Sequence, residues 1–91
     1  MRRAYRGLFE EVEATLARHD PVGIAYVANE YELEVSTILP RAFRATTESE
    51  VLQIVREEFE HSFGSDTTMR QDRFEPIAAE VFAAIQRFRT T

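Results

Sequence analysis

The chain has 91 residues, no cysteine and a net charge of −5; this length favours one domain, and we expect a single helical domain over residues 1–91. With 44% hydrophobic and 30% charged residues, the composition argues against fibrous and disordered classes, and no apolar run approaches the roughly 18 residues of a membrane span. The lack of cysteine excludes disulfides and thiolate metal sites, and the acidic balance argues against a broad basic face for nucleic acid.

A first helix is predicted from about Arg3 to Arg18. Its apolar residues recur at spacings of three and four, which place them on one helical face: Tyr5, Leu8, Phe9, Val12 and Leu16. Asp20-Pro21 is expected to end the helix, because the residue before a proline is disfavoured in the α region. Residues 22–27 are β-prone, but a lone strand has no partner, so we expect a buried connection there.

A second helix is predicted from near Asn29, where Asn29 and Glu32 have the spacing of a capping box. Pro40 interrupts its pattern, since a proline inside a helix removes one backbone hydrogen bond and clashes with the preceding turn. The helix is therefore expected either to kink or to stop at Leu39. Its apolar stripe consists of Tyr31, Val35, Ile38, Leu39, Ala42 and Phe43.

A third helix is predicted from Thr47, with Thr47 as the N-cap and Glu50 completing a capping box. Gly64 is well placed to end it in a left-handed conformation. Its apolar stripe consists of Val51, Leu52, Val55, Phe59 and Phe63, with Ile54 at the edge.

A fourth helix is predicted to begin at Asp72 or Glu75, after a loop over residues 64–71. If Glu75 is the cap, Pro76 takes the first helical position, where its missing N–H costs nothing. The stripe consists of Ile77, Val81, Phe82, Ile85 and Phe88. Four amphipathic segments joined in this way predict an all-α fold, a small four-helix bundle whose second helix is kinked or shortened at Pro40.

The end of the third segment carries the first candidate site, made of Glu57, Glu58, Glu60 and His61. Carboxylates in a last helical turn face the negative end of the helix dipole, which costs a few tenths of a kcal/mol each. One interpretation is a partner-binding surface. The other is a solvated face, paired in part with arginines of a neighbouring helix.

The start of the second segment offers a further candidate surface, formed by Glu30, Tyr31 and Glu34. An exposed tyrosine beside carboxylates is typical of an interaction patch. Alternatively, Tyr26 and Tyr31 bury their rings against the bundle and expose only their hydroxyl groups.

A metal or catalytic site is not expected. Glu58 and His61 form one Glu-x-x-His pair, whereas di-iron bundles use two together with two further Glu. Neither a nucleophile motif nor a Gly-rich phosphate loop is present. We therefore predict no enzymatic activity, no metal ligands and no cofactor.

The run from His19 to Ile24, followed by Asn29-Glu30-Tyr31-Glu32 and the apolar stripe of the second segment, resembles a family of small bacterial all-helical proteins of unknown function. The shared feature is the Asp-Pro-x-Gly-Ile turn, Asp20 to Ile24. The resemblance implies an α-helical domain without established activity. Some proteins of this kind are presumed immunity partners of bacterial toxins.

These observations predict a small protein-binding module that binds a basic protein partner through Glu30, Tyr31, Glu34, Glu57, Glu58, Glu60 and His61, and the resemblance implies that this module is of immunity type. The alternative is a homodimer or larger homo-oligomeric bundle that binds a metal or a small molecule. No nucleic acid or membrane partner is expected. The basic N-terminus lacks an apolar segment, so we expect no secretory signal and a cytoplasmic location.

Overall fold

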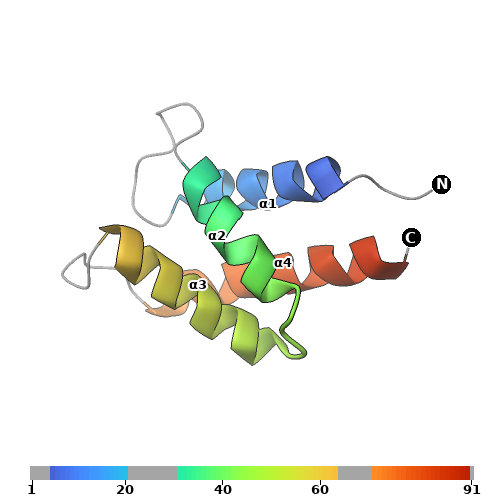
Figure 1. Ribbon diagram of the computed structural model, residues 1–91. Helices are drawn as coiled ribbons and strands as arrows, with labels where there is room; N and C mark the ends of the chain where they lie inside the picture. The colour runs from blue at the N-terminus through green and yellow to red at the C-terminus, as the bar shows by residue number, and fades with distance from the viewer. Residues whose placement is uncertain (1–4, 21–30, 64–70, 91) are drawn as a thin grey trace.

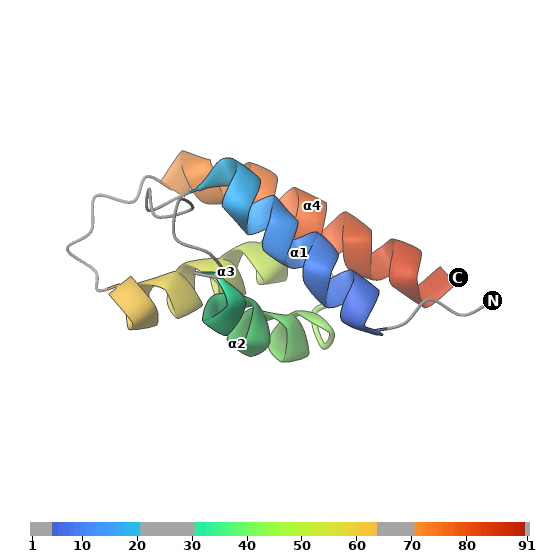
Figure 2. The ribbon, with the colours of Figure 1, turned by 90° about the horizontal axis from the view of Figure 1, so that it is seen from above.

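The computed structural model describes residues 5–20, 31–63 and 71–90, which form four helices. These are α1 (Tyr5–His19), α2 (Glu32–Ala42), α3 (Glu48–Phe63) and α4 (Gln71–Thr90). Helix α1 packs on α2 and α4, and α3 packs on the same two helices. Helices α1 and α4 run antiparallel, with the start of α1 and the end of α4 at the same end (Figures 1 and 2). The predicted all-α bundle is confirmed.

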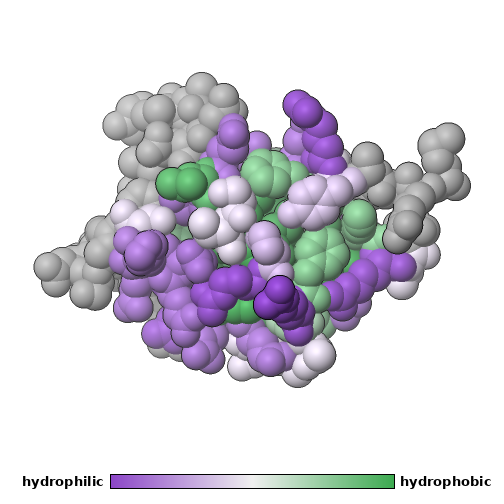
Figure 3. Space-filling view, viewed as in Figure 1, coloured by the Kyte–Doolittle hydropathy of each residue, from purple (hydrophilic) through white to green (hydrophobic). Residues whose placement is uncertain are grey.

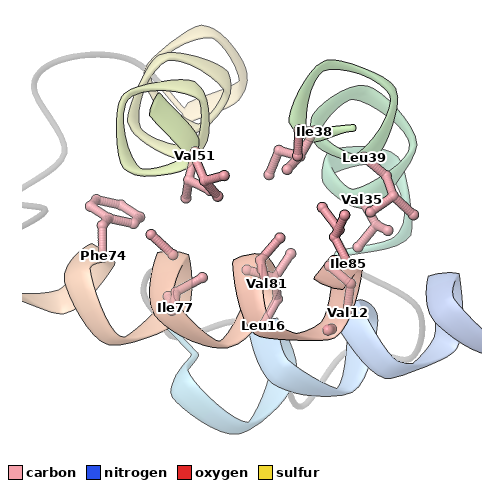
Figure 4. Close-up of a cluster of buried hydrophobic side chains, with 14 of the residues drawn as sticks. Val12, Leu16, Val35, Ile38, Leu39, Val51, Phe74, Ile77, Val81 and Ile85 are labelled. Atoms are coloured by element: carbon pink, nitrogen blue, oxygen red, sulfur yellow. The ribbon is translucent and has the colours of Figure 1, made fainter. Parts of the chain in front are cut away.

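The core lies between two pairs of helices, α2 with α3 and α1 with α4, and their apolar side chains point into the space between (Figure 4). The predicted stripes supply it, because burying each such side chain contributes about 1.5–3 kcal/mol. The completely buried members are Leu8, Val12, Leu16, Val35, Ile38, Leu39, Val51, Val55, Phe59 and Ile77. None of the four described helices combines the length and apolarity that a membrane span needs.

Helix α1 ends at the predicted place, but a left-handed residue and not the following proline alone accounts for its end. Asp20 has a φ of 46°, in the left-handed region that few residues other than Gly, Asn and Asp tolerate. Its N–H donates to the carbonyl of Leu16 at 2.7 Å, which is the single bond of a left-handed helix cap. The predicted connection over residues 22–27 lies outside the described residues.

Helix α2 begins at Glu32, later than predicted, with Tyr31 at the N-cap and no side-chain capping bond. Asn29 lies outside the described residues. The helix continues through Pro40 to Ala42, so of the two predicted alternatives the stop at Leu39 is wrong. Leu39 and Ala42 are both buried on the core side, and this burial offsets the backbone bond that Pro40 removes.

The predicted capping box of α3 is confirmed. The hydroxyl of Thr47 accepts from the Glu50 N–H at 3.2 Å, and Glu50 Oε1 accepts from the Thr47 N–H at 3.1 Å. Glu50 Oε1 also accepts from the N–H and the hydroxyl of Thr46, both at 2.8 Å. The bonds from Thr46, followed by those from Thr47, hold the pKa of Glu50 below its ordinary value. Gly64 lies outside the described residues.

Helix α4 begins at Gln71, so the prediction that Pro76 takes the first helical position is wrong. The alternative start at Asp72 is one residue late. The extra turn carries Phe74, which is buried and packs on Phe59 with ring centroids 5.3 Å apart. This apolar contact explains why the helix extends in front of a proline that disrupts its hydrogen bonding.

Tyr31 connects all four helices at one end of the bundle. Its ring lies 6.0 Å from Phe59 of α3, which in turn packs on Phe74 of α4. Its hydroxyl donates to the carboxylate of Asp20 at the end of α1, at 2.7 Å. With only 2% of its surface exposed, Tyr31 has the buried ring of the alternative interpretation, but its hydroxyl is bonded to Asp20 instead of exposed. Tyr26 lies outside the described residues.

Replacing Tyr31 with Phe should lower the free energy of unfolding by about 1–2 kcal/mol, because the ring stays while the bond to Asp20 is lost. Urea denaturation followed by circular dichroism measures the change. Tyr5→Phe is the matched control, since Tyr5 is 46% exposed and should change stability by less than about 0.5 kcal/mol. Equal stability of Tyr31→Phe and the unmodified protein would contradict this role for the hydroxyl.

Replacing Thr47 with Ala should destabilise the fold by about 1 kcal/mol, because the Glu50 N–H loses its capping acceptor. The same denaturation experiment tests it. Ser49→Ala provides a control in the same helical turn, where a hydroxyl is removed from an exposed position. Similar losses in both variants would show that the cap contributes nothing specific.

Candidate functional site

The predicted acidic site lies along the exposed side of α3, and its residues have different surroundings. Glu57 and Glu60 both line a shallow groove of about 390 Å³, together with Ser49, Leu52, Gln53 and Arg56. We call this set of residues the α3 face. Figure 3 shows hydrophilic side chains gathered over α3 in this view. The α3 face is therefore polar and open to solvent.

Arg41 of α2 holds two of the predicted carboxylates. Its two terminal nitrogens donate to Glu57 Oε1 at 2.7 Å and to Glu58 Oε2 at 2.8 Å. The other oxygen of Glu57 accepts from the side-chain amide of Gln53 at 3.0 Å. The predicted alternative of pairing with an arginine of a neighbouring helix is thus present for Glu57 and Glu58.

These hydrogen bonds shift the pKa values of both Arg41 and Glu57. The hydrogen bond from Arg41, followed by that from Gln53, lowers the pKa of Glu57 below its ordinary value. The same carboxylates raise the pKa of Arg41, Glu57 more than Glu58. The positive charge of Arg41 on α2 therefore offsets the unfavourable interaction of Glu57 and Glu58 with the negative end of the α3 dipole.

Glu60 and His61 are exposed and, within the described residues, form no ion pair. Glu58 is largely covered, with 16% of its side chain exposed, and is bound to Arg41. Glu58 and His61 thus share a helical face but differ in surroundings. Among the residues that the structure describes, no group of three or more potential ligands is placed to hold a metal ion.

The second predicted surface needs correction. Tyr31 and Glu34 are 2% and 3% exposed, so neither belongs to an exposed patch. The reason is their spacing, because Tyr31 at the N-cap and Glu34 in the first turn of α2 continue the core-facing row of Val35 and Ile38. Glu30 lies outside the described residues.

Sequence reasoning missed the charged contacts between α1 and α4. Arg18 and His19 both contact the carboxylate of Glu80, His19 through Nε2 at 2.5 Å, and Arg87 pairs with Glu11. The partners are 61 to 76 positions apart in the chain. No local spacing signals such pairs, because they depend on the antiparallel register of the two helices.

Comparison with known proteins gave no match to a family model, to a curated protein or to a solved structure. The resemblance to small helical bacterial proteins therefore stays an expectation.

Replacing Arg41 with Met should raise the pKa of Glu57 towards its ordinary 4.5, because the main hydrogen bond to the carboxylate is lost. A lowered pKa in the folded state stabilises the fold above the unfolded pKa and ceases to do so as the pH falls through the lowered value. The stability advantage of the unmodified protein over Arg41→Met should therefore vanish in acid.

Carbon-detected NMR titration of the Glu57 carboxyl, combined with thermal unfolding at several pH values, measures both effects. Arg44→Met is the matched control, an exposed arginine just beyond the end of α2 that forms no ion pair within the described residues. An unchanged Glu57 titration in Arg41→Met would show that the guanidinium does not set the pKa.

Proposed function

We propose that this protein is a protein-binding module that engages a basic protein partner through the α3 face. The observation that supports it most directly is the placement of Glu57 and Glu60 in one open groove. Spaced three positions apart, both lie on the same side of α3. Leu52, partly buried against the core, adds an apolar contact within the same groove.

The charge balance favours a basic partner. Helix α3 contains five Glu and a single Arg, and Arg41 offsets only part of this excess. Glu57 stays 44% exposed although Arg41 contacts it. Negative charge that remains accessible on one side raises the association rate of a positively charged partner.

Immunity of the toxin-neutralising type is the specific form of this proposal. It rests on the resemblance of the Asp20 to Ile24 turn and on the negative net charge, which suits a basic toxin. A module that blocks a partner by occupying its surface needs no catalytic group. The proposal therefore asks of the chain only a rigid scaffold and an accessible acidic surface, which the bundle and the α3 face provide.

The test begins with a photo-crosslinking residue at Ser49 of the α3 face, or at Ala14 of α1 for comparison, in cells that express both this protein and its genomic neighbours. The protein captured from Ser49 is then purified. Stopped-flow mixing measures its association with unmodified protein and with Glu57→Lys/Glu60→Lys. We expect association to slow by about tenfold or more and to depend less on salt.

The matched control carries four Lys substitutions at exposed positions of α1 and α4. Together they add the same four units of positive charge as Glu57→Lys/Glu60→Lys. The substituted residues are Ala14, Ala17, Gln86 and Thr90. Slowing by the same factor in this control would point to net charge alone. A captured protein whose association is indifferent to the α3 substitutions would contradict the proposed site.

A further inference from the structure

A second groove, of about 530 Å³, lies between α1 and the start of α2. Its residues on α1 follow one another at helical spacing, so the groove runs along that helix for about 12 Å. They are Tyr5, Arg6, Phe9, Glu10 and Glu13, and Glu32 lines the groove from α2. We call this set of residues the α1–α2 groove. It has none of its lining in common with the α3 face.

The groove contains an exposed aromatic ring in a fixed position. Tyr5 is 46% exposed, stacks on Phe43 with centroids 6.0 Å apart and meets the edge of Phe88 at 6.5 Å. Phe9, partly buried against the core, lies one turn further along α1. A tyrosine held by its neighbours loses little freedom on binding, which is the property of an anchor residue in protein interfaces.

A further bulky apolar side chain is exposed on α2, outside the groove. Leu33, next to Glu32 on α2, is 66% exposed. Apolar side chains gather over the middle of the face where α1 and α2 lie, in contrast to the polar surface over α3 (Figure 3). Exposed apolar side chains that are rimmed by charges in this way are typical of a binding site.

The charges around the groove determine what can occupy it. The groove is lined by three carboxylates and one guanidinium, that of Arg6. Arg6 Nε already lies 3.5 Å from Oε2 of Glu10, which is one of the three. Within the described residues, Glu13 and Glu32 have no cationic partner. The groove is therefore complementary to positive charge beside an apolar side chain. A second copy of this chain, with its net charge of −5, is a poor match.

We infer that the α1–α2 groove is a docking site for a basic amphipathic helix of a partner protein. The bulky apolar side chains of that helix would lie against Tyr5 and Phe9, and its Lys or Arg residues would pair with the carboxylates at the rim. This is the helix-in-groove mode of recognition, in which apolar anchors recur along one face of the bound helix. The inference shares a basic partner with the proposed function but concerns a different surface.

The test uses a fluorescein-labelled synthetic peptide of about 16 residues, with Leu at positions i, i+4, i+7 and i+11 and Lys and Ala elsewhere. One control peptide replaces every Lys with Glu. The other keeps the composition but scrambles the Leu spacing. Fluorescence anisotropy measures binding at about 50 and 300 mM salt. We expect the Lys peptide to bind at least about tenfold more tightly than either control.

Variants of the protein locate the binding. Glu10→Lys/Glu13→Lys and, separately, Tyr5→Ser should each weaken binding of the Lys peptide by about tenfold. Glu57→Lys/Glu60→Lys, with the same change in charge on the α3 face, should weaken it by less than about threefold. Circular dichroism verifies that each variant is folded, and amide chemical shifts of α1 report contact independently of the substitutions.

Three outcomes would overturn the inference. The scrambled peptide binding equally well would show attraction by charge alone, and equal effects of the groove and α3 variants would show the same. Sedimentation of the unmodified protein as a dimer that Tyr5→Ser dissociates would assign the groove to a second copy. In each case the proposed function stays open to its own test, because the rate of association at the α3 face is measured with a different ligand.

Discussion

The arrangement of the four helices depends on the contacts that the buried side chain of Tyr31 forms. It stands directly before α2, packs on Phe59 of α3 and donates a hydrogen bond to Asp20 at the end of α1. Phe59 in turn packs on Phe74 of α4. Asp20 serves twice, because its left-handed backbone ends α1 and its carboxylate accepts from Tyr31. Tyr31 thereby connects the start of α2 both to the end of α1 and to the aromatic side chains of the core.

The opposite end of the bundle uses the same side-chain chemistry with a different result. Tyr5, Phe43 and Phe88 form a second cluster of one tyrosine and two phenylalanines. Arg89 lies over the ring of Phe43, 5.6 Å from its centroid, and donates to the Phe43 carbonyl just beyond α2. Here the tyrosine stays almost half exposed. One aromatic cluster closes the core, and the other leaves an ordered ring at the surface, where it can serve recognition.

Features decided within one or two helical turns could be predicted from the sequence. Apolar spacing located all four helices, and the capping box of Thr47 and Glu50 formed as expected, because both depend on neighbours three or four positions away. Pro76 misled the prediction of α4, since burial of Phe74 outweighs the local preference. The fork of Arg41 on Glu57 and Glu58 joins two helices whose register the sequence does not reveal. The burial of Tyr31 and Glu34 depends likewise on tertiary packing.

The two acidic surfaces differ in what the fold already does with their carboxylates, and this separates their expected contributions to binding. On the α3 face Arg41 pairs with Glu57, so a cation of a bound partner would compete with an internal one, and the proposed surface would act mainly through long-range attraction. In the α1–α2 groove the carboxylates surround an aromatic anchor. Rim charges chiefly change association rates, whereas buried anchors chiefly change dissociation rates. A partner that uses both surfaces would thus owe its speed of binding to α3 and its residence time to Tyr5 and Phe9.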